Sequence, residues 1–125
     1  MTDVELFRLA RAAVERAYAP YSHFRVGAAL LAKDGRVFTG VNVENSSYGA
    51  TICAERTAVV KAVSEGCRGF EAIAVASSDG AAAPCGICRQ FIYEFGDDIR
   101  IIIGDGDDTL KSYSISELLP EGFRL

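Results

Sequence analysis

The sequence feature that most constrains the fold is the alternation of short apolar runs with a helical pattern in the second half of the chain. Phe70 to Ser77 is typical of a buried strand, Cys88 to Phe95 of a helix, and Arg100 to Ile103 of a second, very apolar strand. A strand, a helix and a strand in this order usually form a right-handed crossover between parallel strands. The pattern therefore predicts a sheet with parallel strands and helices on its faces, an α/β fold.

The first half of the chain predicts a helix, a hairpin and a second helix. Apolar residues recur at helical spacing from Val4 to Tyr18, Thr2 and Glu5 are spaced as a capping box, and Pro20 ends the helix. A turn signal follows the first apolar run of the hairpin. The hairpin strands and the next helix are expected at Val26–Ala32, Arg36–Glu44 and Cys53–Glu65.

The connection after the second apolar strand decides the direction of the last strand. Gly104 to Asp108 is too short for a crossover helix, so the strand expected from about Thr109 to Tyr113 runs antiparallel to its neighbour. Ser114 and Glu117 are spaced to cap a short final helix. We therefore expect one domain over residues 1–125, a three-layer α/β/α fold with a five-stranded mixed sheet and an antiparallel last strand.

The composition disfavours several classes of protein. Half of the residues are hydrophobic and 24% are charged, which is typical of a globular chain. Thirteen basic and seventeen acidic residues give a net charge of −4, which disfavours nucleic-acid binding because phosphate neutralisation supplies most of that affinity. No apolar run approaches the roughly 20 residues that span a bilayer, and no secretion-signal layout is present. With its four cysteines interpreted as free thiols, we expect a cytoplasmic protein that binds neither membrane nor nucleic acid.

Three of the four cysteines occur in two short motifs. Cys53 stands two residues before Glu55, and Cys85 and Cys88 form a Cys-x-x-Cys pair. Residues three apart at the start of a helix face the same way, and zinc accepts thiolates in tetrahedral geometry. Three protein ligands leave a fourth position open for water, and Glu55 is placed to manage the protons of that water. The motifs indicate a catalytic zinc site.

A structural interpretation of the same cysteines stays open at this stage. Cys67 is available as a fourth ligand that would close the site, although it follows Gly66 at a helix end and has no partner at short spacing. The chain would then be a structural zinc module that binds a partner, and Glu55 would be dispensable. His23, the only histidine, is interpreted as a structural or surface residue.

The motifs resemble those of the zinc-dependent cytidine deaminase superfamily. The pattern of a zinc-ligand residue followed two residues later by glutamate, and then Pro-Cys-x-x-Cys, is that of zinc deaminases. Further segments resemble the small homotetrameric nucleoside deaminases, so the resemblance covers nearly the whole chain. The matching segments are Ala19–Leu30, Gly40–Asn45, Cys53–Arg56, Pro84–Gln90 and Glu117–Phe123.

The resemblance implies a cytidine deaminase-like fold and hydrolytic deamination of cytidine and deoxycytidine by zinc-activated water. It implies one zinc ion per subunit on Cys53, Cys85 and Cys88, with Glu55 as the catalytic proton carrier and Arg56 neutralising the ligand thiolates. It also implies a nucleoside substrate and a homotetramer whose sites are completed by neighbouring subunits. The implied substrate-binding residues are Phe24, Asn42, Glu44, Tyr48 and Phe123.

Residue chemistry supports the implied sugar site. Asn42 and Glu44 stand two apart on an expected strand, so both side chains are predicted to point the same way. A carboxylate accepts from a ribose hydroxyl, and asparagine both donates and accepts. The carboxylate of Glu44 would repel nearby phosphates, which disfavours nucleotide and nucleic-acid substrates. Deamination of an unusual cytosine nucleoside, such as an antibiotic, remains an alternative.

Overall fold

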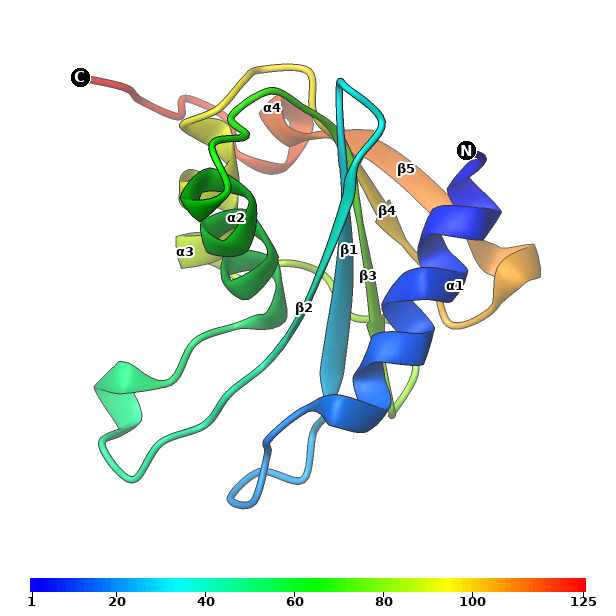
Figure 1. The fold of residues 1–125 in the computed structure, drawn as a ribbon, viewed down its shortest axis with the longest axis vertical. Coiled ribbons are helices and arrows are strands. Elements are labelled where there is room, and N and C mark those ends of the chain that lie inside the picture. The colour runs from blue at the N-terminus through cyan, green and yellow to red at the C-terminus, as the bar shows by residue number, and fades with distance from the viewer.

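The protein, described over residues 1–125 by a computed structural model, contains a five-stranded sheet in the order β2-β1-β3-β4-β5 (Figure 1). The strands are β1 (Val26–Ala32), β2 (Val37–Val41), β3 (Phe70–Ser77), β4 (Arg100–Ile103) and β5 (Lys111–Ser114). β1 is antiparallel to both β2 and β3, β3 and β4 are parallel, and β5 is antiparallel to β4. The predicted mixed sheet with an antiparallel last strand is confirmed.

Helices cover both faces of the sheet. α1 packs on one face, whereas α2 and α3 lie on the other (Figure 1). The predicted crossover through α3 joins β3 to its parallel neighbour β4. α2 connects β2 to β3, and β1 lies between these two strands in the sheet. The helices are α1 (Asp3–Ala13), α2 (Ala54–Ser64), α3 (Gly86–Tyr93) and the short α4 (Ile115–Leu118).

Alternation along the strands divides the core into two clusters. In β1, Ala29 and Leu31 join the cluster under α1, and Ala28 and Leu30 join the cluster under α2 and α3. All four side chains are buried, as expected for a strand with helices on both faces. The three-layer α/β/α prediction is therefore confirmed.

Two glycines let helices lie directly on the sheet backbone. A Cβ on Gly27 of β1 would stand 2.2 Å from the carbonyl oxygen of Ala10 in α1. A Cβ on Gly40 of β2 would stand 2.5 Å from the carbonyl oxygen of Ala54, the first residue of α2. Only glycine permits so close an approach of two backbones.

The first predicted helix is correct at its start but too long at its end. The Thr2 hydroxyl accepts from the amide of Glu5, and the Glu5 carboxylate accepts from the amide of Thr2, which confirms the capping box. The α-helix ends at Ala13, however, and one 3₁₀ turn, Val14–Arg16, follows it. Such tightening satisfies the last carbonyls of a helix with shorter-range hydrogen bonds.

The other boundary differences also come from local hydrogen bonds. β2 ends at Val41 and not at Glu44, because the chain then leaves the sheet to bridge Tyr18 and Ile52 through Val43. α3 begins at Gly86, two residues earlier than predicted. β5 begins at Lys111 because the amide of Thr109 donates to the carbonyl of Gly106 and closes a 3₁₀ turn there.

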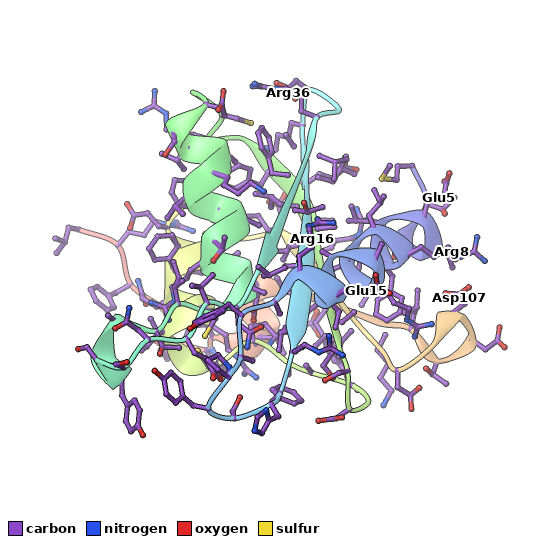
Figure 2. The ribbon with its side chains drawn as sticks, turned by 60° about the horizontal axis from the view of Figure 1, so that its bottom comes forward. Glu5, Arg8, Glu15, Arg16, Arg36 and Asp107 are labelled. Atoms are coloured by element: carbon purple, nitrogen blue, oxygen red, sulfur yellow. The ribbon has the colours of Figure 1, made fainter.

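The outer surface of α1 carries charged side chains (Figure 2). Arg8 reaches the loop before β5, where its guanidinium lies 2.8 Å from the carboxylate of Asp107. Exposed pairs of this kind contribute at most about 1 kcal/mol to stability. No helix has the length and apolar character needed to cross a membrane.

Candidate active site and metal centre

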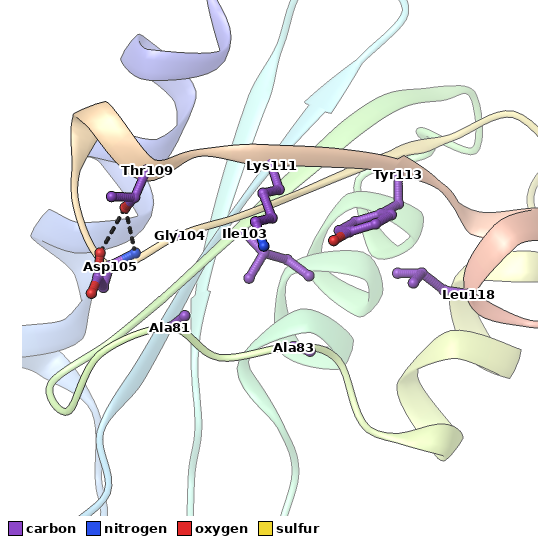
Figure 3. Close-up of a pocket in the computed structure, with 9 residues that line it drawn as sticks. All are labelled: Ala81, Ala83, Ile103, Gly104, Asp105, Thr109, Lys111, Tyr113 and Leu118. Atoms are coloured by element: carbon purple, nitrogen blue, oxygen red, sulfur yellow. Dashed lines mark hydrogen bonds between the residues drawn. The ribbon is translucent and has the colours of Figure 1, made fainter.

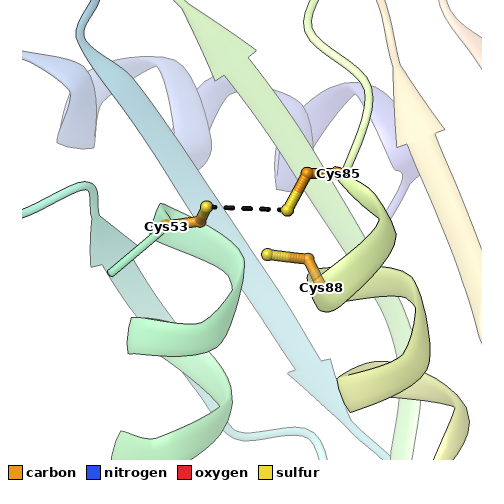
Figure 4. Close-up of side chains that lie close together, drawn as sticks. All are labelled: Cys53, Cys85 and Cys88. Carbon is orange, nitrogen blue, oxygen red and sulfur yellow. Dashed lines mark hydrogen bonds between the residues drawn. The ribbon is translucent and has the colours of Figure 1, made fainter. Parts of the chain in front are cut away.

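Two helix starts bring the three motif cysteines together (Figure 4). Cys53 is the N-cap of α2 and Cys85 the N-cap of α3, both with extended backbone. Cys88 lies in the first turn of α3, so its side chain returns toward Cys85. The partial positive charge of both helix N-termini is therefore directed at the sulfurs, which favours thiolates there.

The spacing of the sulfurs suits a tetrahedral metal ion. The Sγ atoms of Cys53 and Cys85 lie 3.8 Å apart, and all three Sγ atoms lie within 4.8 Å of one another. A tetrahedral site with zinc–sulfur bonds of 2.3 Å has a sulfur–sulfur edge of about 3.8 Å. The cluster therefore fits one zinc ion with three thiolate ligands.

Neighbouring groups already bias one sulfur toward the ionised form. Donation from the Cys88 thiol, reinforced by Arg56, lowers the pKa of Cys53 to about 5. The same hydrogen bond, together with burial, raises the pKa of Cys88. The Arg56 Nη2 atom lies 3.6 Å from the Cys53 sulfur, and the buried Arg56 Nε has no hydrogen-bond partner. A guanidinium in this position compensates negative charge on the cluster.

Glu55 is placed beside the cluster by the first turn of α2. Its side chain is only 4% exposed, yet no cation forms a salt bridge with it. Burial raises the pKa of Glu55 to about 7, and the negative charge of Cys53 adds to the shift. A buried carboxyl group without a permanent partner is suited to holding and releasing a proton.

A cavity of about 210 Å³ lies against this cluster. Its lining residues include Cys53, Glu55 and Cys85 together with Phe24 and Asn42. The structure therefore brings two of the predicted substrate-binding residues to the same cavity as the metal cluster and the predicted proton carrier.

Asn42 ties the end of β2 to the segment that leads into β1. Its Oδ1 accepts from the amide of Val26 at 2.9 Å, and its Nδ2 donates to the carbonyl of Phe24 at 2.8 Å. The amide is buried, and its orientation is fixed by these two bonds. One N–H and one carbonyl lone pair remain available to a ligand.

Glu44 lies outside the residues that line the cavity. β2 ends at Val41, so Asn42 and Glu44 follow the strand and do not lie within it. The Glu44 carboxylate instead accepts from the backbone amides of Tyr21 and Ser22 and from the Ser22 hydroxyl. These bonds, led by that hydroxyl, lower the pKa of Glu44.

Tyr48 and Phe123 do not reach the cavity of their own chain. Their side chains are 78% and 64% exposed, which is unusual for large aromatic residues. Tyr48 stands on a 3₁₀ turn, and Phe123 borders an apolar groove along α3 with Ile87 and Phe91. Within this chain both side chains point to the outside.

Cys67 lies at the far end of α2 from the metal cluster. Its Sγ is 3.9 Å from the carbonyl oxygen of Gly69, and an 11-residue helix separates it from Cys53 by about 16 Å. It therefore cannot close the site as a fourth ligand. His23 adopts a positive φ of 60° in the loop before β1 and belongs to no metal-binding cluster.

Sequence reasoning missed part of the cavity wall. Thr51, Ile52 and Ala82 line the cavity but carry no chemistry that marks them in the sequence. Ala83 lines both this cavity and a separate groove of about 450 Å³ beside β4 and β5 (Figure 3). The one sequence signal for Thr51, Ile52 and Ala82 is that they stand close to the cysteine motifs. The loop before Cys85 thus borders both the cavity beside the cysteine cluster and the groove beside β4 and β5.

Comparison with protein families gives one consistent result. Residues 1–104 match the family described as the cytidine and deoxycytidylate deaminase zinc-binding region. A probable cytidine deaminase of Dictyostelium discoideum is 59% identical over 106 residues, which cover 83% of this chain and 71% of that protein. A cytidine deaminase of Sporosarcina psychrophila is 48% identical over 124 residues, which cover 97% of this chain and 91% of that protein.

Solved structures agree with the sequence comparison. The 1.6 Å crystal structure of cytidine deaminase from Burkholderia pseudomallei matches with a TM-score of 0.93 and 47% identity, over 98% of this chain and 100% of that chain. A blasticidin-S deaminase of Bacillus cereus is more distant, at 32% identity over 127 residues, which cover 94% of this chain and 89% of that protein.

Proposed function

The chain belongs to the cytidine and deoxycytidylate deaminase family, and from this premise we propose that it hydrolyses cytidine and deoxycytidine to uridine and deoxyuridine with release of ammonia. The observation that carries the proposal is that Cys53, Cys85 and the buried Glu55 line one cavity, with the sulfur of Cys88 beside those of the other two cysteines. One deaminase domain over residues 1–125 would supply these groups.

Cys53, Cys85 and Cys88 would hold the zinc ion. When bound, zinc lowers the pKa of a water molecule and so supplies a hydrolytic nucleophile near neutral pH. Three thiolates and a dication leave a net charge of about −1, which opposes that deprotonation. Arg56 and the two helix N-termini offset part of this charge.

Glu55 would carry protons during the reaction. Its carboxylate would take a proton from the attacking water and deliver it to N3 of the cytosine ring. It would then take the proton of the new hydroxyl group on C4 and pass it to the amino group, which leaves as ammonia while the C4 carbonyl forms. Burial beside the cavity keeps this carboxyl group away from bulk water, so the proton remains available for these transfers.

The nucleoside would be held by Phe24 and Asn42, which line the cavity, and by Glu44, which the Ser22 hydroxyl links to the amide of Phe24. Phe24 would pack against the base, and Asn42 and Glu44 would bind the sugar hydroxyls. A phosphate beside Glu44 would be repelled by the ionised carboxylate, which supports a nucleoside over a nucleotide or nucleic acid. The net charge of −4 adds to this preference.

Tyr48 and Phe123 would act across subunit boundaries. Both side chains are exposed and point away from their own cavity, as residues that complete a neighbour's site must. We therefore infer a homotetramer in which neighbouring chains close each cavity from water. Sedimentation is expected to show a tetramer, and a fully active monomer would remove both residues from the site.

The four free cysteines support a reducing, cytoplasmic setting. In such a setting the reaction would return cytosine nucleosides to the uridine pool, which is pyrimidine salvage.

The test is direct. The zinc-loaded protein is incubated separately with cytidine, deoxycytidine, their 5′-monophosphates and blasticidin S, and ammonia release is followed with and without a chelator. We expect release from the two ordinary nucleosides, little from the monophosphates, and loss of activity with the chelator. Turnover of blasticidin S alone would favour the antibiotic deaminase, and zinc binding without any turnover would favour the structural module.

A further inference from the structure

The loop before β1 donates three hydrogen bonds to the carboxylate of Glu44. Glu44 Oε1 accepts from the amides of Tyr21 at 2.9 Å and Ser22 at 3.1 Å, and Oε2 accepts from the Ser22 hydroxyl. A carboxylate has about four acceptor positions. Three are therefore occupied by this loop, and about one remains for a ligand.

The same hydroxyl also contacts the segment that carries Phe24. The Ser22 Oγ accepts from the amide of Phe24 at 3.0 Å while it donates to Glu44. The left-handed backbone of His23, with φ of 60°, turns that amide back toward Ser22. Asn42 holds the carbonyl of Phe24 on the other side. One hydroxyl thus connects a cavity-lining residue to Glu44, which is otherwise outside the cavity wall.

We propose that Ser22 is a positioning residue for sugar recognition, which fixes the Glu44 carboxylate so that its one remaining acceptor position receives a nucleoside hydroxyl. The inference rests on the proposed function, because it concerns how the same site binds its substrate. Ser22 itself is exposed at the rim and lies outside the cavity wall, so it acts through Glu44. Its hydroxyl also lowers the pKa of that carboxyl group.

The experiment compares two substrates that differ only at the 3′-hydroxyl. Kinetic constants of Ser22→Ala are measured with deoxycytidine and with 2′,3′-dideoxycytidine. For deoxycytidine we expect kcat/KM to fall about fivefold to tenfold, mainly through KM, as for a lost charge-assisted hydrogen bond. For 2′,3′-dideoxycytidine we expect a change of less than about twofold, because that substrate offers Glu44 no 3′-hydroxyl.

Three further variants separate positioning from general loop support. Ser46→Ala is the matched control, because Ser46 joins the same two loops through the Tyr21 hydroxyl at 2.6 Å but does not touch Glu44. This variant is expected to leave kcat and KM for both substrates unchanged. Ser22→Thr retains the hydroxyl and is expected to restore wild-type KM. Adding Ser22→Ala to Glu44→Gln is expected to have little further effect, since both act on one contact.

The outcomes distinguish this inference from the proposed function. Equal losses on both substrates, or a loss confined to kcat, would overturn the positioning role and indicate a structural one. Full additivity with Glu44→Gln would overturn it as well. If the wild-type protein turns over neither cytidine nor deoxycytidine, the proposed function itself fails. If the wild-type protein is active but the variants do not show the expected pattern, only the role of Ser22 is overturned and the proposed deaminase function stands.

Discussion

Two groups of residues at and around the cavity are constructed differently. The metal end is built on helix starts and consists of Cys53, Glu55, Arg56, Cys85 and Cys88. The group that we propose binds the sugar, called here the sugar end, is built on loops and consists of Phe24 and Asn42, which line the cavity, and Glu44, which lies outside its lining. At the metal end Glu55 and Cys88 are buried, and regular helix geometry fixes the side chains. At the sugar end side-chain to backbone hydrogen bonds fix Asn42 and Glu44 across distant segments.

The difference separates chemistry from recognition. A helix start offers a rigid backbone and a favourable dipole, which reactive thiolates need. A hydrogen-bonded loop offers acceptor and donor positions that match a polar ligand. We therefore expect changes at the metal end to alter kcat or zinc affinity and changes at the sugar end to alter KM.

The largest effect is expected for Glu55→Gln. The amide retains the shape of the side chain but cannot carry protons, so kcat should fall by roughly 10²- to 10⁴-fold. Zinc content, measured by atomic absorption, should remain one ion per chain. Turnover of cytidine near the wild-type rate would refute the mechanism.

Arg56→Gln is expected to weaken zinc binding by about 10- to 100-fold, because a group that supports metal ligands is lost. Competition with a chromogenic chelator measures the affinity. Lys61→Gln is a suitable control, since Lys61 lies further along α2 and donates to the carbonyl of Thr39, away from the sulfurs. An equal loss of affinity in both variants would point to a general charge effect and not to the Cys53 contact.

Glu44→Gln tests the sugar end. Removal of the charge should raise KM for cytidine by about tenfold, since an ionised acceptor binds a hydroxyl more strongly than an amide does. Because this side chain lies at the rim, the free energy of unfolding should change by less than about 1 kcal/mol. Steady-state kinetics and urea unfolding provide both values, and unchanged KM would remove Glu44 from sugar binding.

Cys67→Ser belongs to neither end and should have the smallest effect on function. The zinc content and kcat are expected to stay within about twofold of wild type. Burial of a hydroxyl in place of the thiol should cost about 1 kcal/mol of unfolding free energy. Loss of zinc in this variant would revive the structural zinc module.

The same comparison explains what the sequence could and could not predict. Part of the metal end follows from local spacing, because Cys-x-x-Cys at a helix start places the sulfurs of Cys85 and Cys88 together in any fold. Cys53 stands 32 residues before Cys85 and joins them only through tertiary folding, so its place in the site was expected from the resemblance of its motif. The antiparallel last strand was also predictable, since the short connection after Gly104 permits little else. The contacts of Glu44 were not, because Ser22 precedes it by 22 residues and meets it only through tertiary folding.

The end of β2 was missed for a related reason. Val43 continues the apolar alternation of the strand, yet its backbone pairs with Tyr18 and Ile52 outside the sheet. The pattern of side chains cannot reveal which segment supplies the hydrogen bonds.

The contact between Gly40 and the first residue of α2 has a consequence for the metal end. Since peptide atoms alone meet there, no rotamer change can alter the height of that helix above the sheet. The backbone of Cys53 and Glu55 is therefore held at the same height above the sheet, because these residues flank Ala54, which contacts Gly40 of β2. Thermal rearrangement of neighbouring side chains should thus leave the distance between the ligand sulfur and the proton carrier nearly constant.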